Sequence, residues 1–116
     1  MSQVRAFKLS ERELRPGCRV IQVEGELDLS VADELGEVVS RAGAECSQVL
    51  ICLADCQFID STGIAVIVHA HHQLAEQGRR VAVYAASDQV MRILTVTGLT
   101  SNGLVFESIE EALSSS

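Results

Sequence analysis

Residues that could do chemistry meet in the stretch Phe58–Ile64, where Asp60, Ser61 and Thr62 stand between two apolar runs. This pattern is typical of a strand that turns into a helix. Asp60 suits the N-cap of that helix, because its carboxylate can accept hydrogen bonds from the unpaired N–H groups of the first turn. Ser61 then lies on the first turn, where the helix dipole tolerates an added phosphate. The residue types leave Ser61 three roles: a cap, a nucleophile or a switch.

The three histidines are the natural partners for a serine nucleophile or a metal ion, and their positions suit neither role. His69, His71 and His72 lie at least two helical turns after Ser61, more than about 10 Å away along the axis at ~1.5 Å per residue. His69 and His72 are neighbours at i, i+3, but the sequence places no third ligand beside them. We therefore expect neither a Ser-His pair nor a metal site.

Motifs and charge narrow the function classes. The sequence has no nucleophile elbow, phosphate-binding loop or dinucleotide-binding loop, so we expect no enzyme activity and no cofactor. The formal net charge is -7, and residues 24–60 carry nine acidic side chains and one basic one. Such an acidic domain is a poor candidate for nucleic-acid binding, which needs clustered Lys and Arg. The acidic block fits a basic protein partner, or it serves solubility alone.

The apolar runs and the cysteines indicate the compartment. The longest apolar stretches have about five or six residues, far short of the roughly 18 that span a bilayer, and the N-terminus lacks the pattern of a signal peptide. We therefore expect a cytoplasmic protein that does not enter a membrane. Its four cysteines are then expected as reduced thiols without a zinc motif: Cys18, Cys46, Cys52 and Cys56.

Outside this turn, period-two and period-3.6 apolar patterns alternate, which predicts strands interleaved with helices in one domain over residues 1–116. The expected strands are residues 3–9, 18–25, 48–53, 79–85 and 104–106, the first two forming a hairpin. The expected helices are residues 31–43, 61–77, 88–97 and 107–113, the first three with Ser30, Asp60 and Ser87 as N-caps. Residues 55–57 are expected as a short loop, and residues 114–116 as a disordered tail.

This order of elements predicts an α/β domain: a mixed, mostly parallel sheet of about five strands with about four helices. Parallel strands need crossover connections, which the intervening helices supply. In open sheets of this kind, functional sites gather at the carboxyl ends of the strands. The Ser61 turn follows such an end.

Several segments resemble one known family along essentially the whole chain. Gly25–Asp28 resembles the family's segment after its second strand, and Asp60–Ile64 resembles its phosphorylation loop. Thr97–Leu99 and Phe106–Leu113 resemble its C-terminal part. The family is that of the STAS domains (sulphate transporter and anti-sigma factor antagonist), and the chain resembles in particular the stand-alone anti-sigma factor antagonists.

The resemblance implies a partner-switching phosphoprotein that regulates transcription, as in stress responses. The unphosphorylated form would bind an anti-sigma factor that is also a serine kinase, and so release a sigma factor. Phosphorylation of Ser61 would break this complex, and a serine phosphatase would restore it. We assign the partner interface to Asp28, Asp60, Ser61, Thr62 and Gly63, with Gly63 as the small residue that lets a partner approach.

Physical reasoning favours a switch at an interface. A phosphate adds about -1.5 to -2 charges, which a helix N-terminus tolerates and a partner surface built for a neutral hydroxyl does not. Two alternatives stay open. The first is a STAS scaffold or sensor module in stress signalling or lipid transport that is not phosphorylated. The second is an antagonist regulated through the thiol of Cys56 or Cys46.

Overall fold

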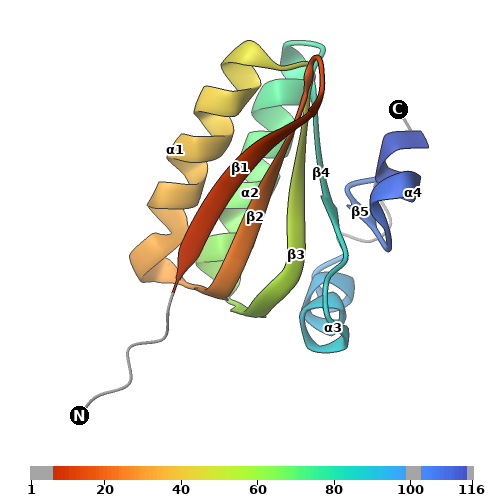
Figure 1. Ribbon diagram of the computed structural model, residues 1–116. Coiled ribbons are helices and arrows are strands. Elements are labelled where there is room, and N and C mark those ends of the chain that lie inside the picture. The colour runs from red at the N-terminus through yellow and green to blue at the C-terminus, as the bar shows by residue number, and fades with distance from the viewer. Residues whose placement is uncertain (1–6, 99–102, 115–116) are drawn as a thin grey trace.

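The computed structural model describes residues 7–98 and 103–114, which form one sheet and four helices (Figure 1). The strands are β1 (Lys8–Arg15), β2 (Cys18–Leu27), β3 (Gln48–Ile59), β4 (Arg80–Tyr84) and β5 (Val105–Phe106). The helices are α1 (Leu29–Glu45), α2 (Ser61–Glu76), α3 (Asp88–Val96) and α4 (Ile109–Ser114). Three stretches named in the sequence analysis lie wholly or partly outside the described residues: 3–9, Thr97–Leu99 and 114–116.

The sheet has the order β1-β2-β3-β4-β5. β1 and β2 form the predicted antiparallel hairpin, and every other neighbouring pair is parallel. The helices that connect the parallel strands provide the crossovers that such pairing requires. The prediction of an α/β domain with a mixed, mostly parallel sheet is confirmed.

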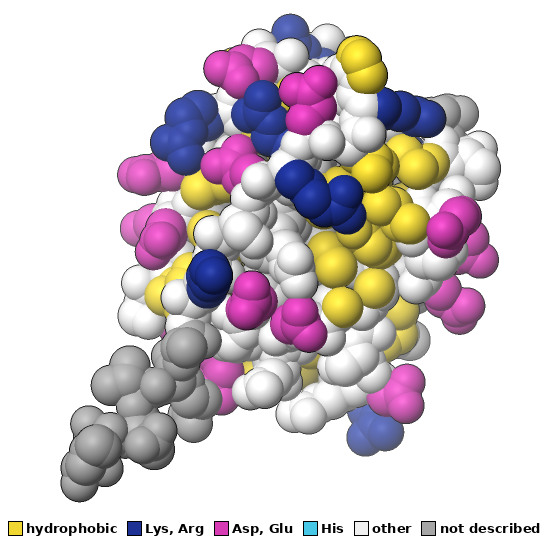
Figure 2. Space-filling view, in the orientation of Figure 1, with side chains coloured by type: hydrophobic (Ala, Val, Ile, Leu, Met, Phe, Trp, Pro, Cys, Tyr) yellow, Lys and Arg dark blue, Asp and Glu magenta, His cyan; other side chains and the backbone are white. Residues whose placement is uncertain are grey.

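Two helices cover one face of the sheet and a third covers part of the other. α1 and α2 lie side by side on the first face, and α4 lies against the second (Figure 1). The larger core is aliphatic and lies under α1 and α2, with contributions from Val90 and Leu94 of α3. The smaller core includes Leu50, Tyr84 and Ala112, and Figure 2 shows apolar side chains gathered on this second face beside α4.

The first strand extends further along the chain than predicted. β1 overlaps residues 3–9 only at its beginning, because it runs up to a two-residue turn at Pro16-Gly17, where Gly17 has a φ of 82°. Most of its side chains are exposed, and five of the eight are charged. Charged residues are typical of an edge strand, where they discourage pairing with other chains. They also conceal the apolar alternation by which a strand is recognised.

The third strand is longer than predicted, and residues 55–57, expected as a loop, belong to it. β3 continues to Ile59, and its pairing with β2 shifts between Gln22 and Glu24 and again between Gly25 and Glu26. Each shift places one extra residue on β3, which is the geometry of a β-bulge. Bulges break the regular alternation, so this half of the strand has the sequence pattern of a loop.

The start of α3 and the ends of α2 and α3 follow the predicted signals, whereas the C-terminal end of α4 does not. Ser87 caps α3 by accepting a hydrogen bond from the Val90 N–H at 3.3 Å. Gly78 and Gly98 follow α2 and α3 in the left-handed conformation, with φ values of 74° and 82°. Ser114, expected in a disordered tail, instead ends α4, and its hydroxyl donates to the Glu111 carbonyl at 3.4 Å. The single hydrogen bond extends the last helical turn.

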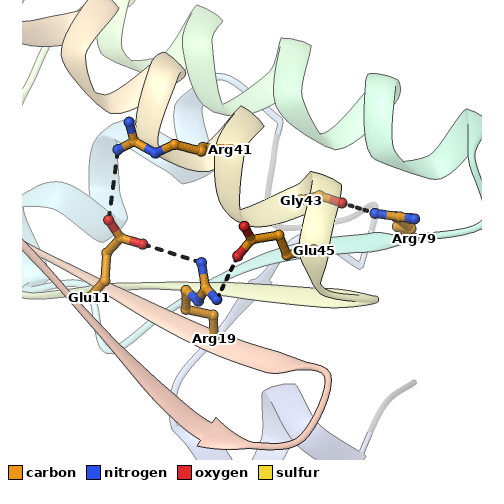
Figure 3. Close-up of polar contacts among 6 residues, drawn as sticks. All are labelled: Glu11, Arg19, Arg41, Gly43, Glu45 and Arg79. Carbon is orange, nitrogen blue, oxygen red and sulfur yellow. Dashed lines mark hydrogen bonds and ion pairs between the residues drawn. The ribbon is translucent and has the colours of Figure 1, made fainter.

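Ionic contacts join the hairpin to the end of α1 that lies far from the Ser61 turn (Figure 3). Arg19 contacts Glu45 at 3.0 Å and Glu11 at 3.6 Å, and Arg41 lies 3.9 Å from Glu11. Arg79 also donates to the carbonyl of Gly43 on α1. These contacts fix α1 relative to the sheet at one end, while the capping aspartates described below fix it at the other.

Candidate functional site

The candidate site lies where α1 and α2 begin, at one edge of the sheet. β2 and β3 are parallel neighbours whose last residues, Leu27 and Ile59, pair with each other. Each strand is followed by an aspartate that caps the next helix: Asp28 for α1 and Asp60 for α2. The two helix N-termini therefore emerge side by side, with their positive dipole ends at the same edge (Figure 1).

Asp60 holds the turn through several hydrogen bonds. One carboxylate oxygen accepts from the Thr62 N–H at 2.9 Å, from the Gly63 N–H at 3.1 Å and from the Thr62 hydroxyl. The Asp60 N–H donates to the Leu27 carbonyl at 3.1 Å, which ties the turn to the end of β2. The prediction that Asp60 is the N-cap is confirmed.

The same contacts keep Asp60 ionised. The hydrogen bond from the Thr62 hydroxyl is the main cause that lowers the pKa of the Asp60 carboxyl, and the N–H groups of Gly63 and Thr62 add to it. The Leu29 N–H, from the first turn of α1, lies close enough to lower this pKa as well. The Asp60 carboxylate therefore interacts chiefly with the first turn of α2.

The N-cap of α1 lies two residues before the predicted position. Asp28, not Ser30, is the N-cap, and its carboxylate accepts from the Ser30 N–H at 3.0 Å and the Ser30 hydroxyl at 2.7 Å. The helix consequently begins at Leu29. Asp28, which we expected at a partner interface, therefore has a structural role as well.

Ser61 is the first residue of α2, and its side chain is exposed. Within residues 7–98 and 103–114, no hydrogen bond engages its hydroxyl. The cap role belongs to Asp60, and the histidines lie further along α2, with His69 and His72 exposed. The position offers a free hydroxyl at the positive end of a helix, with carboxylates on the residues that cap both helices.

Thr62 and Gly63 support the turn from within. Thr62 is half-buried and gives its hydroxyl to Asp60, while Gly63 is buried. A Cβ atom at Gly63 would stand 2.8 Å from Leu27 Cγ and 3.0 Å from both Ile59 Cγ1 and the Leu27 carbonyl oxygen. The glycine thus lets α2 begin directly against the strand ends, a reason within the fold that is separate from the approach of a partner.

Sequence reasoning missed two apolar residues beside this turn. The side chain of Leu29 is 73% exposed and that of Phe58 is 36% exposed. Leu29 follows the Asp28 cap at the position that Ser61 occupies after Asp60, and Phe58 lies two residues before Asp60. The signal for Leu29 is the aspartate before it, because a residue directly after an N-cap lies on the first turn of the helix, where side chains can point to solvent.

The cysteines are free thiols in the structure. Cys56 is buried below the Ser61 turn, and its thiol donates to the Phe58 carbonyl at 3.3 Å. Burial raises the pKa of Cys56, so the reactive thiolate is disfavoured. Cys46 is also buried. Among the described residues no group of metal-ligating side chains is close enough to hold an ion, and no helix has the length and apolar character of a membrane span.

Comparisons with known proteins agree on one family. The model of the STAS domain family matches residues 10–112. The anti-sigma F factor antagonist of Paenibacillus polymyxa is 27% identical over 107 residues, which cover 89% of this chain and 90% of that protein. The anti-sigma-B factor antagonist of Bacillus subtilis is 29% identical over 79 residues, which cover 68% of this chain and 72% of that protein.

Two solved proteins share the fold. An anti-sigma factor antagonist from Mycobacterium paratuberculosis superposes with a TM-score of 0.85 at 21% identity, covering 99% of this chain and 97% of that one. The anti-sigma factor antagonist SpoIIAA superposes in its unphosphorylated form with a TM-score of 0.76 at 21% identity, over 95% of each chain. The phosphorylated form of SpoIIAA, from Bacillus, gives a TM-score of 0.70 at 20% identity, over 95% of this chain and 98% of that one.

Proposed function

Because this chain belongs to the STAS domain family, we propose that it is an anti-sigma factor antagonist switched off by phosphorylation of Ser61. In this proposal the unmodified chain binds an anti-sigma factor in the cytoplasm and releases a sigma factor. The anti-sigma factor is also the serine kinase that modifies Ser61, and a serine phosphatase reverses the modification. The names of the curated relatives support the antagonist role.

The observation that carries the switch is the exposed Ser61 hydroxyl at the N-terminus of α2. The fold does not use this hydroxyl, so a phosphate there displaces no internal contact. The helix dipole favours the added negative charge, while the nearby Asp60 carboxylate opposes it in part. We therefore expect the phosphorylated chain to stay folded, and SpoIIAA, which shares the fold, does have a phosphorylated form.

The partner, in contrast, would meet a changed surface. A pocket that accepts a neutral hydroxyl would have to accommodate about -1.5 to -2 additional charges and strip water from them. Asp28 and Asp60 already make this edge acidic, so a phosphate would add like charge beside two carboxylates that the partner must also accommodate. A loss of about 3 kcal/mol would weaken the complex roughly a hundredfold, which is sufficient for a switch.

Binding of purified variants tests the proposal. We would titrate each anti-sigma factor of the source organism with the wild-type chain, Ser61→Ala and Ser61→Asp by calorimetry. We expect Ser61→Ala to bind like the wild type and Ser61→Asp to bind roughly a hundredfold more weakly, with unchanged circular dichroism. Ser40→Asp, at an exposed serine on α1 far from the turn, is the matched control for an added charge. Equal binding by Ser61→Asp would contradict the switch.

A second measurement tests the modification. The wild-type chain and Ser61→Ala are incubated with ATP and each anti-sigma factor that binds, and the mass is then measured. We expect one added phosphate on the wild type and none on Ser61→Ala. If no serine kinase of the organism modifies the chain, the scaffold or sensor role becomes the better account.

A further inference from the structure

Two large apolar side chains are exposed beside the Ser61 turn. Leu29 and Phe58 are 73% and 36% exposed, and the only other large hydrophobic residue of comparable exposure in the described part of the chain is Val96, at 81%. Val96 ends α3, at the opposite end of that helix from its Ser87 cap. Single exposed apolar residues are common on protein surfaces. Leu29 directly follows the Asp28 cap and Phe58 lies two residues before the Asp60 cap, and we call these two residues the Leu29–Phe58 pair.

The backbone places this pair on two sides of the turn. Leu29 begins α1, and its N–H approaches the Asp60 carboxylate, which directly precedes Ser61. Phe58 lies on β3 two residues before Asp60 and pairs with Glu26 of β2. Both positions are fixed by the hydrogen bonds of the caps and the sheet, so little conformational freedom of the backbone is lost when a partner binds them.

The fold gains little from exposing Leu29. The helix would begin equally well with a polar residue after the Asp28 cap, as α2 does with Ser61 after Asp60. The surrounding side chains are acidic: Glu26, Asp28 and Asp60 are all half-buried at the same edge. An apolar centre with a charged border is the arrangement of a protein interface, in which a central anchor contributes most of the affinity.

We propose that Leu29 is the apolar anchor of the partner interface. This inference rests on the proposed function, since the occupant to which we commit is the anti-sigma factor. The acidic border requires a basic partner surface, so the complementary site is an apolar pocket with Lys or Arg at its rim. Insertion of Leu29 would bring the partner into contact with Ser61 and exclude water from its hydroxyl. A phosphate on Ser61 would then oppose the closure of this apolar contact.

The test is a titration with the anti-sigma factor that binds the wild-type chain. Leu29→Ala removes the anchor, and Val96→Ala removes an equally exposed apolar side chain elsewhere and is the matched control. We expect Leu29→Ala to weaken binding about tenfold or more and Val96→Ala to leave it unchanged. Both variants should keep the wild-type unfolding midpoint, because neither side chain is buried.

A salt series tests the chemistry of the pocket. Between 50 and 300 mM salt, on the order of a sixfold change, opposite charges at the interface rim predict weaker binding at higher salt. Wild type and Leu29→Ala should show the same salt dependence, since the substitution removes no charge. Affinity that does not fall with salt would contradict the proposal that basic residues surround the partner's pocket.

The remaining outcomes separate this inference from the proposed function. If the wild-type chain binds an anti-sigma factor and Leu29→Ala binds equally well, the anchor is wrong and the antagonist function stands. If Leu29→Ala and Val96→Ala weaken binding alike, the effect is not specific to the turn and the anchor is also wrong. If no anti-sigma factor binds, both proposals fail. A wild-type dimer in sedimentation that Leu29→Ala dissociates would show that a second copy of the chain is the occupant.

Discussion

α1 and α2 begin at neighbouring strand ends, each directly after an aspartate that caps it. In both, the cap accepts from the N–H and the hydroxyl of the residue two positions later, Ser30 in α1 and Thr62 in α2. The first helical residue differs: Leu29 in one and Ser61 in the other. The same local structure thus begins one helix with an exposed apolar side chain and the neighbouring helix with an exposed hydroxyl. The shared geometry belongs to the fold, and the difference is available for function.

The third helical residue differs for a structural reason. It is the half-buried Val31 in α1 and the buried Gly63 in α2. A Cβ at Gly63 would meet Leu27, whereas Val31 carries its side chain in a half-buried position. The backbone of α2 therefore lies directly against Leu27 at Gly63, and its cap accepts one N–H group more than the cap of α1.

The largest effect is expected at this third position. Gly63→Val should destabilise the fold by about 3 kcal/mol, because overpacking against the Leu27 carbonyl cannot be relieved by a side-chain rotation. Gly36→Ala is the matched control within α1: its Cβ would lie 3.5 Å from Val66, an ordinary contact, and helix propensity predicts a gain of about 0.5–1 kcal/mol. Urea unfolding measures both. Equal stability of Gly63→Val and the wild type would show that the turn can relax.

The next largest effects are expected from substituting the two capping aspartates, and they should differ from each other. Asp60→Ala should cost about 2 kcal/mol and Asp28→Ala about 1 kcal/mol, since substitution of an N-cap costs ~0.5–2 kcal/mol. Asp60 accepts from two N–H groups and a hydroxyl, whereas Asp28 accepts from one N–H group and a hydroxyl. The unfolding free energies of the two variants at pH 7 give the comparison. A larger loss at Asp28 would mean that α1, not α2, depends more on its cap.

The sequence predicted the cap of α2 correctly but not the cap of α1. Asp60 was recognised because the residues that follow it include an uninterrupted apolar run, so the start of α2 is sharp. The sequence does not define the first residue of α1, since Ser30 is also a good cap and Leu29 has the character of a strand residue. The second half of β3 was not predicted as strand, because two β-bulges interrupt its alternation of apolar residues. Most of β1 was not predicted either, because its charged residues interrupt the same alternation. The exposure of Leu29 depends on whether Asp28 or Ser30 caps the helix, and the pairing of β2 with β3 up to Leu27 places Asp28 at the cap.

The contribution of the Asp60 cap to stability should depend on pH. The hydrogen bond from the Thr62 hydroxyl lowers the pKa of Asp60 in the folded chain below its ordinary value of 3.8. A carboxyl with a depressed folded pKa stabilises the fold above its unfolded pKa, and this contribution is lost as the pH falls through the folded value. The stability difference between the wild type and Asp60→Asn should therefore be largest at neutral pH and shrink as the pH is lowered from 4 toward 2. Urea titrations across this range measure it, and a difference that is constant with pH would contradict the ionised cap.

The smallest effect on stability is expected where the two helix starts differ most. Leu29→Ser gives α1 the same kind of first residue as α2, and it should change the free energy of unfolding by no more than about 0.5 kcal/mol, because the side chain is 73% exposed. Its binding to the anti-sigma factor should nevertheless fall about tenfold, as for Leu29→Ala. A stability loss above about 1 kcal/mol would show that Leu29 packs within the fold. Unchanged stability with weakened binding would place the difference between the two helices entirely at the partner interface.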